Sequence, residues 1–377
     1  MSKNKRRSIP PKTVLKLWAL AAGRCEFLGC NKPLWRDELT WHEADFSHIA
    51  HIISASPKGP RGHKKLSKRL AQDFSNLMLV CLKHHKLIDD KKYVKKYSVE
   101  RLRSYKQAHE RRIHIQTSKT EEMKSAILIF KAKIGDRMVE IPFEDAVKAI
   151  TPRFPADGKP ILMDYTNFSI TNRKSYWCQL KEQIKRDVEL YLRKPNDIRH
   201  LSIFAIGPIP LLMYLGKCIG NIVPADLYQR HRDTQNWTWK FDRRGNNFRY
   251  ILRSSNINSR NKKVALVLSL SGKIHSQEIR KLINQNDPYY EITIKKPSPL
   301  FLNSKDKLTQ FQKVYRVLMT KIRERHGGNC QIYLFPAVPA PIAVSCGKEL
   351  LPKVDPIISV YDRIDDKQGF KYAIKLN

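Results

Sequence analysis

An internal repeat in the C-terminal part of the chain constrains its fold more than any other feature. The segment 200–219 aligns with 331–350 after a shift of 131 residues. Five positions are then identical: Phe204 and Phe335, Pro208 and Pro339, Pro210 and Pro341, Gly216 and Gly347, and Lys217 and Lys348. A segment that recurs at a fixed shift predicts two copies of one structural unit.

Both copies carry the same order of predicted elements. Each repeat segment follows an amphipathic helix, and each helix follows a strand, as the spacing of the apolar residues indicates. The pairs are the strands 161–169 and 291–298 and the helices 174–192 and 304–326. Between the copies, 262–274 is a continuous apolar run typical of a parallel-sheet strand. We therefore predict an α/β domain of two pseudo-symmetric Rossmann-like halves, at about 127–255 and 256–377.

Such a domain has an expected place for a ligand. Open parallel sheets bind ligands outside the carboxyl ends of their strands, where helix N-termini present free N–H groups to anions. Two facing ends suit an anionic ligand that is itself nearly two-fold symmetric. The alternative is a duplication with a purely structural role.

The polar stretch 117–126 lacks periodicity and follows a helical pattern, so it is predicted to be a linker. The part before it, 1–116, is rich in Cys and His. The predicted organisation is thus an N-terminal domain at 1–116, a linker and a C-terminal domain at 127–377.

Four metal-ligand residues of the N-terminal part occur as two close pairs. Cys25 and Cys30 form the first pair, and Cys81 and His84 form the second. Two pairs that flank one segment suit a tetrahedral structural zinc ion, which would clamp a small domain. The alternative is buried thiols and a surface histidine. Seven cysteines, an odd number, argue against a secreted disulfide framework and favour a reducing compartment.

Between these pairs lies FSHIAHIIS at 46–54, and the second pair falls within SNLMLVCLKHH at 75–85. The order His51, Asn76, His85 resembles the HNH nuclease family, a ββα fold around one metal, over about residues 13–112. The resemblance implies that His51 is the general base and that His85 holds Mg²⁺ or Mn²⁺. Asn76 would fix the backbone of the metal loop or orient His51, and His84 would bind the zinc.

One position departs from the family pattern. Many HNH nucleases have a metal ligand immediately before the base, whereas this chain has Ala50. His48 and Asp45 are the two residues that we expect to compensate.

The charge of the chain favours a polyanionic partner. Its 71 Lys and Arg residues exceed its 35 Asp and Glu residues, which gives a net charge of +36. Basic residues concentrate in the loop between the two HNH segments: Lys58, Arg61, Lys64, Lys65, Lys68 and Arg69. Further basic runs follow at 91–97 and 101–106. Contacts of this kind bind phosphates without reading bases, so we expect double-stranded DNA as substrate with little sequence preference. The alternative is a solvated basic face.

The sequence favours a soluble cytoplasmic protein without a membrane partner. The uncharged run 201–216 is too short to span a bilayer and is broken by Pro208 and Pro210. Lys16 and Arg24 make the N-terminal segment unlike a cleaved signal peptide.

Two segments of the C-terminal part, FAIGPIPLLMYLG at 204–216 and DLYQRHRDTQNWTW at 226–239, resemble the SAVED family of two CARF-like units. The whole chain is similar to the HNH-SAVED effectors of CBASS, a bacterial anti-phage system, so the resemblance implies a bacterial cytoplasmic protein. This resemblance implies that a cyclic dinucleotide is the allosteric activator and that a resting dimer forms a higher homo-oligomer when active. The expected ligand-binding residues are Pro208, Pro210, Tyr228, Gln229, Arg230, Arg232, Trp237, Trp239, Phe335, Pro336, Pro339 and Pro341. The alternative for the tryptophans is a place in the core.

The sequence thus predicts a metal-dependent DNA endonuclease that a cyclic oligonucleotide switches on. Two alternatives stay open. One is a constitutive HNH restriction nuclease with a C-terminal reader of modified DNA, and the other is a non-catalytic, zinc-containing DNA-binding regulator.

Overall fold

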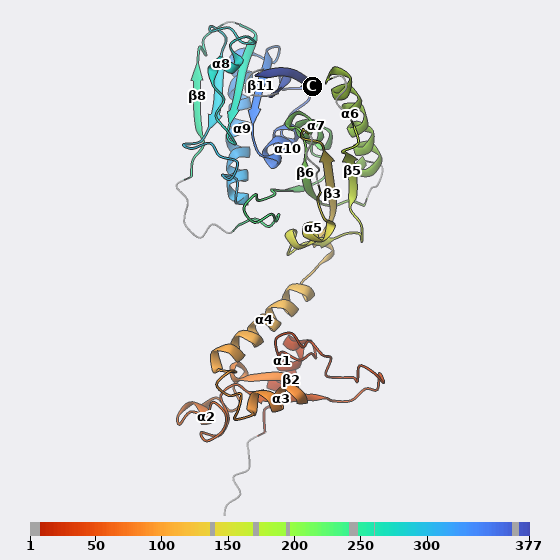
Figure 1. The fold of residues 1–377 in the computed structure, drawn as a ribbon, viewed down its shortest axis with the longest axis vertical. Coiled ribbons are helices and arrows are strands. Elements are labelled where there is room, and N and C mark those ends of the chain that lie inside the picture. The colour runs from red at the N-terminus through yellow and green to blue at the C-terminus, as the bar shows by residue number, and fades with distance from the viewer. Residues whose placement is uncertain are drawn as a thin grey trace, which may run out of the picture. The chain divides into compact units, whose positions relative to one another are not determined.

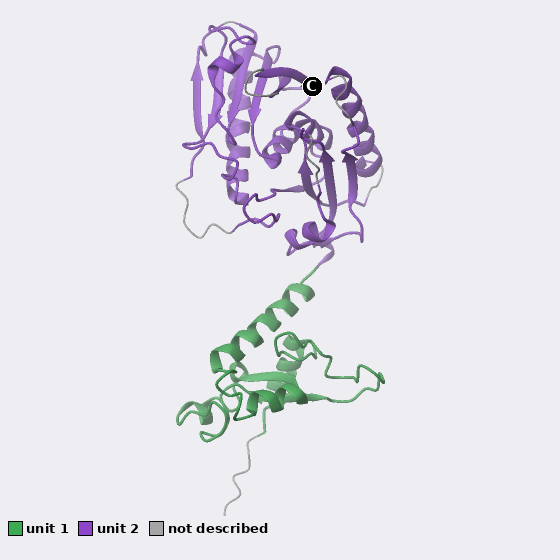
Figure 2. Ribbon diagram, viewed as in Figure 1, with its two compact units in different colours: residues 1–119 green, residues 120–377 purple. Residues whose placement is uncertain are grey.

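The chain is described here by a computed structural model that covers residues 8–135, 140–168, 173–193, 197–240, 248–259, 261–363 and 369–377. It divides into two compact units, residues 1–119 and 120–377 (Figure 2). The predicted linker 117–126 holds the last residue of helix α4, the short helix η2 (Glu121–Met123) and the start of strand β3 (Lys124–Ala132).

Unit 1 contains a two-stranded sheet followed by a helix. Its elements are α1 (Pro11–Ala21), β1 (Ser47–His51), α2 (Leu66–Arg69), η1 (Phe74–Asn76), β2 (Leu77–Cys81), α3 (Leu82–Asp89) and α4 (Val99–Thr117). Strands β1 and β2 are antiparallel, with His51 opposite Leu77. Every residue of β2 is buried, and α3 continues from it without a loop. The order β1, β2, α3 is therefore a compact ββα unit.

Unit 2 contains two mainly parallel sheets. The first has the order β4 (Phe154–Pro155), β3, β6 (Leu201–Ile206), β7 (Ala225–Tyr228), with β5 (Ile161–Tyr165) also paired to β3. The second has the order β13 (Phe370–Lys375), β12 (Ile357–Arg363), β11 (Gln331–Ala337), β9 (Lys263–Ser269), β10 (Tyr289–Thr293), β8 (Ile251–Ser255). Only the edge strands β8 and β13 of the second sheet pair in antiparallel fashion.

The two sheets share one topology. The order β5-β3-β6-β7 in the first corresponds to β10-β9-β11-β12 in the second, and all these pairs are parallel. The helices of unit 2 are α5 (Phe143–Ala149), α6 (Arg173–Val188, continued by the π-helical turn η3, Glu189–Arg193), α7 (Ile209–Ile219), α8 (Ser276–Ile279), α9 (Lys305–His326) and α10 (Ala340–Lys348). The predicted α/β fold of the C-terminal part is confirmed.

Several element bounds differ from the predicted pattern. The strands predicted at 262–274 and 291–298 are β9, which ends at Ser269, and β10, which ends at Thr293. Residues 251–255, which the boundary at 255/256 gives to the first half, form the edge strand β8 of the second sheet. The predicted strand 161–169 ends at Tyr165, and its last residue lies outside the described residues.

The two copies of the repeat contact each other where helix α7 crosses helix α10. Figure 1 shows these two helices side by side in the middle of unit 2. A Cβ atom on Gly216 would lie 1.9 Å from the carbonyl oxygen of Val344, and one on Gly347 would lie 1.9 Å from that of Met213. The two contacts are equivalent to each other, because the shift of 131 residues relates Gly216 to Gly347 and Met213 to Val344. The repeated glycine thus lets the two helix backbones touch at the pseudo-two-fold axis.

We expect Gly347→Ala to destabilise unit 2 by about 3 kcal/mol or more, because the added methyl group collides with backbone that cannot rotate away. Gly272→Ala is the matched control, since no atom lies within 4 Å of its Cβ position. Urea unfolding followed by tryptophan fluorescence measures both. Equal midpoints for the two variants would contradict the close helix contact.

One apolar core joins the two halves. It draws on β3, β6, β9 and β11 and on the helices α6, α7, α9 and α10. Smaller clusters contain α5 on the first sheet and α8 on the second. Among the helices of the described ranges, none combines the length and the apolar character that crossing a bilayer requires.

Candidate functional site

The four predicted zinc ligands come together in unit 1. The ligand atoms of Cys25, Cys30, Cys81 and His84 all lie within 4.8 Å of one another. His84 Nδ1 lies 3.2 Å from Cys81 Sγ and 3.6 Å from Cys25 Sγ. Zinc bonds of about 2.1 Å to nitrogen and 2.3 Å to sulfur place tetrahedral ligands at separations of this size. The donor set therefore fits a structural zinc ion.

Neighbouring groups hold these ligands in place. The His84 ring stacks on Phe27, with ring centroids 4.0 Å apart and planes 2° from parallel. The backbone N–H of Cys81 donates a hydrogen bond to Cys25 Sγ at 3.4 Å. Burial raises the pKa of the Cys25 thiol well above its usual range, backbone hydrogen bonds from Cys81 and Phe27 oppose this rise, and the neighbouring thiols of Cys81 and Cys30 add to it. Thiols crowded in this way become good ligands when a cation compensates the charge of their thiolates.

His51 lies at the end of β1 with one ring nitrogen engaged. Its Nε2 is 2.9 Å from the carbonyl oxygen of Ala71. A carbonyl only accepts hydrogen bonds, so the neutral ring carries its proton on Nε2 and keeps a lone pair on Nδ1. A half-buried imidazole fixed in this tautomer is suited to take a proton from water.

Asn76 supports this arrangement from a completely buried position. Its Oδ1 accepts a hydrogen bond from the N–H of Ile53 at 2.8 Å, and its Nδ2 donates to the carbonyl of Ile53 at 2.8 Å. Nδ2 also donates to the carbonyl of Leu70 at 3.1 Å, next to the carbonyl that holds His51. The amide therefore fixes the loop backbone, and any influence on His51 passes through the 70–71 backbone.

His85 lies on α3 beside His48 of β1, with ring centroids 5.3 Å apart. Burial lowers the pKa of His85, His48 and His51 lower it further, and Asp89 opposes them. The neutral form that binds metals is thus favoured. The carboxylate of Asp45, the other residue expected to help hold the metal, accepts a hydrogen bond from the N–H of Ser47 at 2.8 Å. Over the ranges that the structure describes, His85 and His48 join no group of three potential metal ligands.

The prediction that Arg61 binds DNA is wrong in this structure. Its guanidinium is 4% exposed and donates to the carbonyls of Ile52 at 2.6 Å and Ile88 at 2.5 Å. It also contacts the Asp89 carboxylate at 3.1 Å. Arg61 therefore ties the end of β1 to the end of α3. Sequence reasoning also missed Asp89 and the carbonyl of Ala71.

We expect Arg61→Ala to lower the stability of unit 1 by about 2–4 kcal/mol, because it leaves buried carbonyls and a carboxylate without their donor. Lys68→Ala is the matched control, since Lys68 is exposed. Thermal unfolding and DNA binding, measured on both variants, separate the two roles. A loss of DNA affinity with unchanged unfolding in Arg61→Ala would restore the original assignment.

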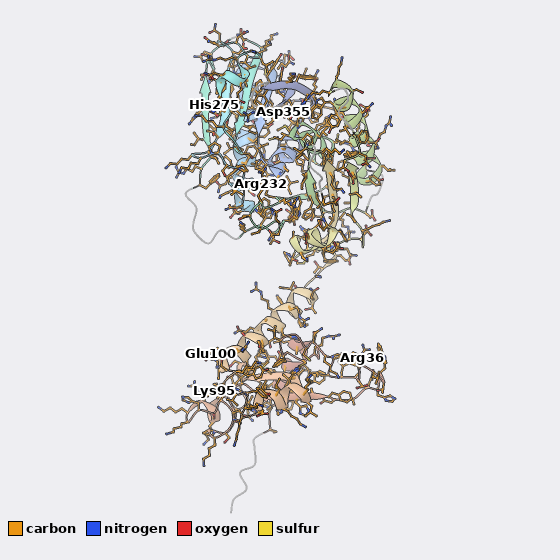
Figure 3. All side chains as sticks on the ribbon, viewed as in Figure 1. Arg36, Lys95, Glu100, Arg232, His275 and Asp355 are labelled. Atoms are coloured by element: carbon orange, nitrogen blue, oxygen red, sulfur yellow. The ribbon has the colours of Figure 1, made fainter. Side chains whose placement is uncertain are left out.

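The other predicted DNA-binding residues are exposed: Lys58, Lys64, Lys65, Lys68 and Arg69. Lys91, Lys92, Lys95 and Lys96 are exposed as well, and Figure 3 labels Lys95 among the side chains of unit 1. Their ammonium and guanidinium groups are thus available to phosphates.

Three aromatic residues predicted to bind the ligand belong to the core instead. Tyr228 stacks on Phe204 at 4.5 Å and is 6% exposed, while Trp237 meets Phe204 edge-on at 5.2 Å and is 2% exposed. Phe335 is fully buried against Tyr361 of β12 at 4.9 Å. Tyr228 and Trp237 pack around Phe204 in one of the two smaller cores, and Phe335, the pseudo-equivalent of Phe204, is buried in the other. Their ring faces are therefore covered by protein and do not meet a base.

The segment after β7 nevertheless contains unsatisfied polar groups. Gln229 Oε1, His231 Nε2 and Trp239 Nε1 are buried and have no hydrogen-bond partner within the described part of the chain. Trp239 is half-buried and meets His231 edge-on at 5.8 Å. Buried polar atoms normally find partners, so these three atoms are candidates for contacts with a polar ligand. Arg232 is exposed and Arg230 is half-buried in the same segment (Figure 3 labels Arg232).

The repeated prolines begin the two central helices. Pro208 and Pro339 precede α7 and α10, and Pro210 and Pro341 occupy the second helical position of each. Proline has no N–H, so the prolines shape these turns without donating to a ligand. Pro336 is buried within β11.

This fold, with its unsatisfied segment at the carboxyl end of a parallel strand, defines a two-part α/β ligand-binding domain. A family model of the SMODS-associated and fused to various effectors sensor domain, SAVED, matches residues 180–376. The match covers more than half of the chain, and the chain belongs to the SAVED family. The prediction of a SAVED sensor domain is confirmed.

Solved structures with a similar fold have distant sequences. The Acinetobacter baumannii Cap4 SAVED/CARF-domain containing receptor with the cyclic trinucleotide 2'3'3'-cAAA is 13% identical, with a TM-score of 0.44 over 82% of this chain and 61% of that chain. The Moraxella osloensis Cap4 receptor is 12% identical, with a TM-score of 0.42 over 76% of this chain and 60% of that chain. The chain thus spans less than two thirds of the length of these receptors. No curated protein matches it.

Proposed function

We propose that the chain is a metal-dependent endonuclease for double-stranded DNA that a cyclic oligonucleotide activates through the SAVED domain. The observation that best supports nuclease activity is the hydrogen bond from His51 Nε2 to the carbonyl oxygen of Ala71, which leaves Nδ1 free to act as a base. It occurs on a ββα unit whose zinc-ligand set accounts for His84 and leaves His85 available.

Four side chains of unit 1 have defined tasks in this proposal. His51 takes the proton of the attacking water at Nδ1. Asn76 positions the 70–71 backbone that orients His51. His85, with His48 beside it, would hold the Mg²⁺ or Mn²⁺ ion. When bound, such an ion supplies positive charge that stabilises the negative charge developing on the phosphate and leaving oxygen.

The basic residues give binding without sequence readout. The exposed lysines of the loop 58–69 and of the segment 91–97 favour phosphate contacts on either strand. We therefore propose weak sequence preference and an affinity that falls steeply with salt.

The SAVED domain would supply the switch. Its proposed ligand is a cyclic dinucleotide, held by Gln229, His231 and Trp239, whose unpaired polar atoms suit base edges, and by Arg230 and Arg232, which suit phosphates. Ligand binding would convert a resting dimer into a higher homo-oligomer in which unit 1 cuts DNA. An anti-phage role in CBASS follows from this combination.

Plasmid cleavage tests the proposal. The unchanged protein and His51→Ala are incubated with Mg²⁺ or Mn²⁺ and a panel of cyclic di- and trinucleotides, the latter because the Cap4 receptor structures contain cyclic trinucleotides. Cutting by the unchanged protein with one ligand, and none by His51→Ala, supports both halves. Cutting without ligand favours a constitutive restriction nuclease. DNA binding without cutting under every condition favours a zinc-containing regulator.

A further inference from the structure

A loop of unit 1, residues 35–46, exposes large apolar side chains that the proposed chemistry does not use. We call this segment the arm. Leu39 is 88% exposed, Trp41 is 64% exposed, and Phe46 and Trp35 are 41% and 40% exposed. Figure 3 labels Arg36 on it, at the edge of unit 1. So many exposed apolar side chains within one short segment indicate a contact surface.

The arm has an ordered structure of its own. The Arg36 guanidinium lies 3.9 Å from the ring centroid of Trp41 and 4.7 Å from that of Trp35. The Asp37 carboxylate accepts hydrogen bonds from Thr40 N at 2.9 Å, Thr40 Oγ1 at 3.0 Å and Leu39 N at 3.1 Å. A preformed surface loses less conformational entropy when a partner binds.

The charge of the arm is opposite to that of its surroundings. It carries the acidic residues Asp37, Glu38, Glu43 and Asp45 and one basic residue, Arg36, which gives −3. The rest of residues 1–119 has 26 basic and 6 acidic residues, which gives +20. An acidic surface is repelled by phosphates and attracted by a basic protein. The charge therefore disfavours nucleic acid and favours a second copy of this chain.

Unit 1 also presents a surface that complements the arm. A hollow of about 450 Å³ lies beside α4, lined by the apolar side chains of Phe27, Leu28 and Ala108, by His109 and Arg112, and by the buried Glu26. Leu28 is 60% exposed, and both Ala108 and Arg112 are exposed. The apolar walls suit Leu39 and Trp41, and the exposed guanidinium of Arg112 suits a carboxylate of the arm.

We propose that the arm of one copy docks in the hollow of unit 1 of a second copy. The contact joins two different surfaces, so it is heterologous, and each pair of copies retains one free arm and one free hollow. Such a contact extends into chains or closes into rings. It goes beyond the proposed function, and it concerns assembly whether or not DNA is cut.

Mass measurements on purified full-length protein test this contact. The arm variant is Leu39→Ser with Trp41→Ser, and the hollow variant is Ala108→Glu, which adds bulk and negative charge. Leu15→Ser is the matched control, because Leu15 on α1 is 71% exposed but lies outside both surfaces. Sedimentation velocity over concentrations up to the order of 100 µM gives the masses, a range that captures weak interfaces. Circular dichroism verifies that each variant is folded.

We expect the unchanged protein and Leu15→Ser to form species larger than those of either variant. A mixture of the arm variant and the hollow variant is expected to pair through one intact contact, without extending further. Unchanged masses in both variants, or a mixture that behaves like its components, would overturn the proposal. An arm variant that loses DNA affinity at unchanged mass would assign the arm to nucleic acid instead.

Discussion

His51→Ala is expected to lower ligand-activated DNA cleavage by about 10²–10⁴-fold, the range that a general base contributes. The substitution removes the Nδ1 lone pair that the hydrogen bond to Ala71 leaves free for water. It leaves the exposed lysines in place, so DNA affinity is expected to stay within about two-fold because phosphate contacts supply it.

The matched control is His114→Ala, because His114 is an exposed histidine of α4. Single-turnover cleavage with saturating protein separates the chemical step from binding, and fluorescence anisotropy on labelled DNA measures the affinity. Equal cleavage rates for the two variants would show that His51 has a structural role, and the base would have to be sought elsewhere.

Much of unit 1 could be predicted because its signals are local. The two ligand pairs are each separated by a few residues, and β2 runs directly into α3, so Cys81 and His84 share one turn. The order of His51, Asn76 and His85 likewise follows the order of β1, η1 and α3.

Arg61 shows where such reasoning ends. It lies in a loop rich in exposed lysines, and nothing in the sequence of that loop indicates that the Arg61 side chain is buried. The backbone there has a φ of 53°, an uncommon value for a side chain other than glycine, and the guanidinium reaches the backbone of both β1 and α3. Only the fold shows that this cation satisfies buried carbonyls.

The aromatic residues of unit 2 show a second limit. A segment such as 226–239 contains both polar and aromatic residues without a regular period, so its sequence does not say which side chains meet a ligand and which meet the core. The repeat contained the missing signal, because Phe204 and Phe335 recur at the shift of 131 residues and each lies at the centre of an aromatic cluster. A repeated aromatic residue within a strand is better read as core.

Removal of the zinc ion that we propose for the Cys25, Cys30, Cys81 and His84 cluster is expected to unfold unit 1 and leave unit 2 folded. Apparent zinc-binding free energies of about 10–16 kcal/mol in small zinc domains are folding free energies, which a small core does not replace. The main cluster of unit 1 contains only a dozen buried residues, and two of them are the ligands Cys25 and Cys81. Unit 2 has its own, larger core.

Cys81→Ser tests this expectation, with Cys178→Ser as the matched control because Cys178 is an exposed cysteine of α6. Metal content by mass spectrometry should fall by about one zinc per chain in the first variant only, as expected for one tetrahedral site. Hydrogen exchange should become fast throughout β1, β2 and α3 and stay slow in β6, β11 and the crossing of α7 with α10, since the two units have separate cores. Slow exchange in β2 of a zinc-free Cys81→Ser protein would show that the ββα unit folds without the metal.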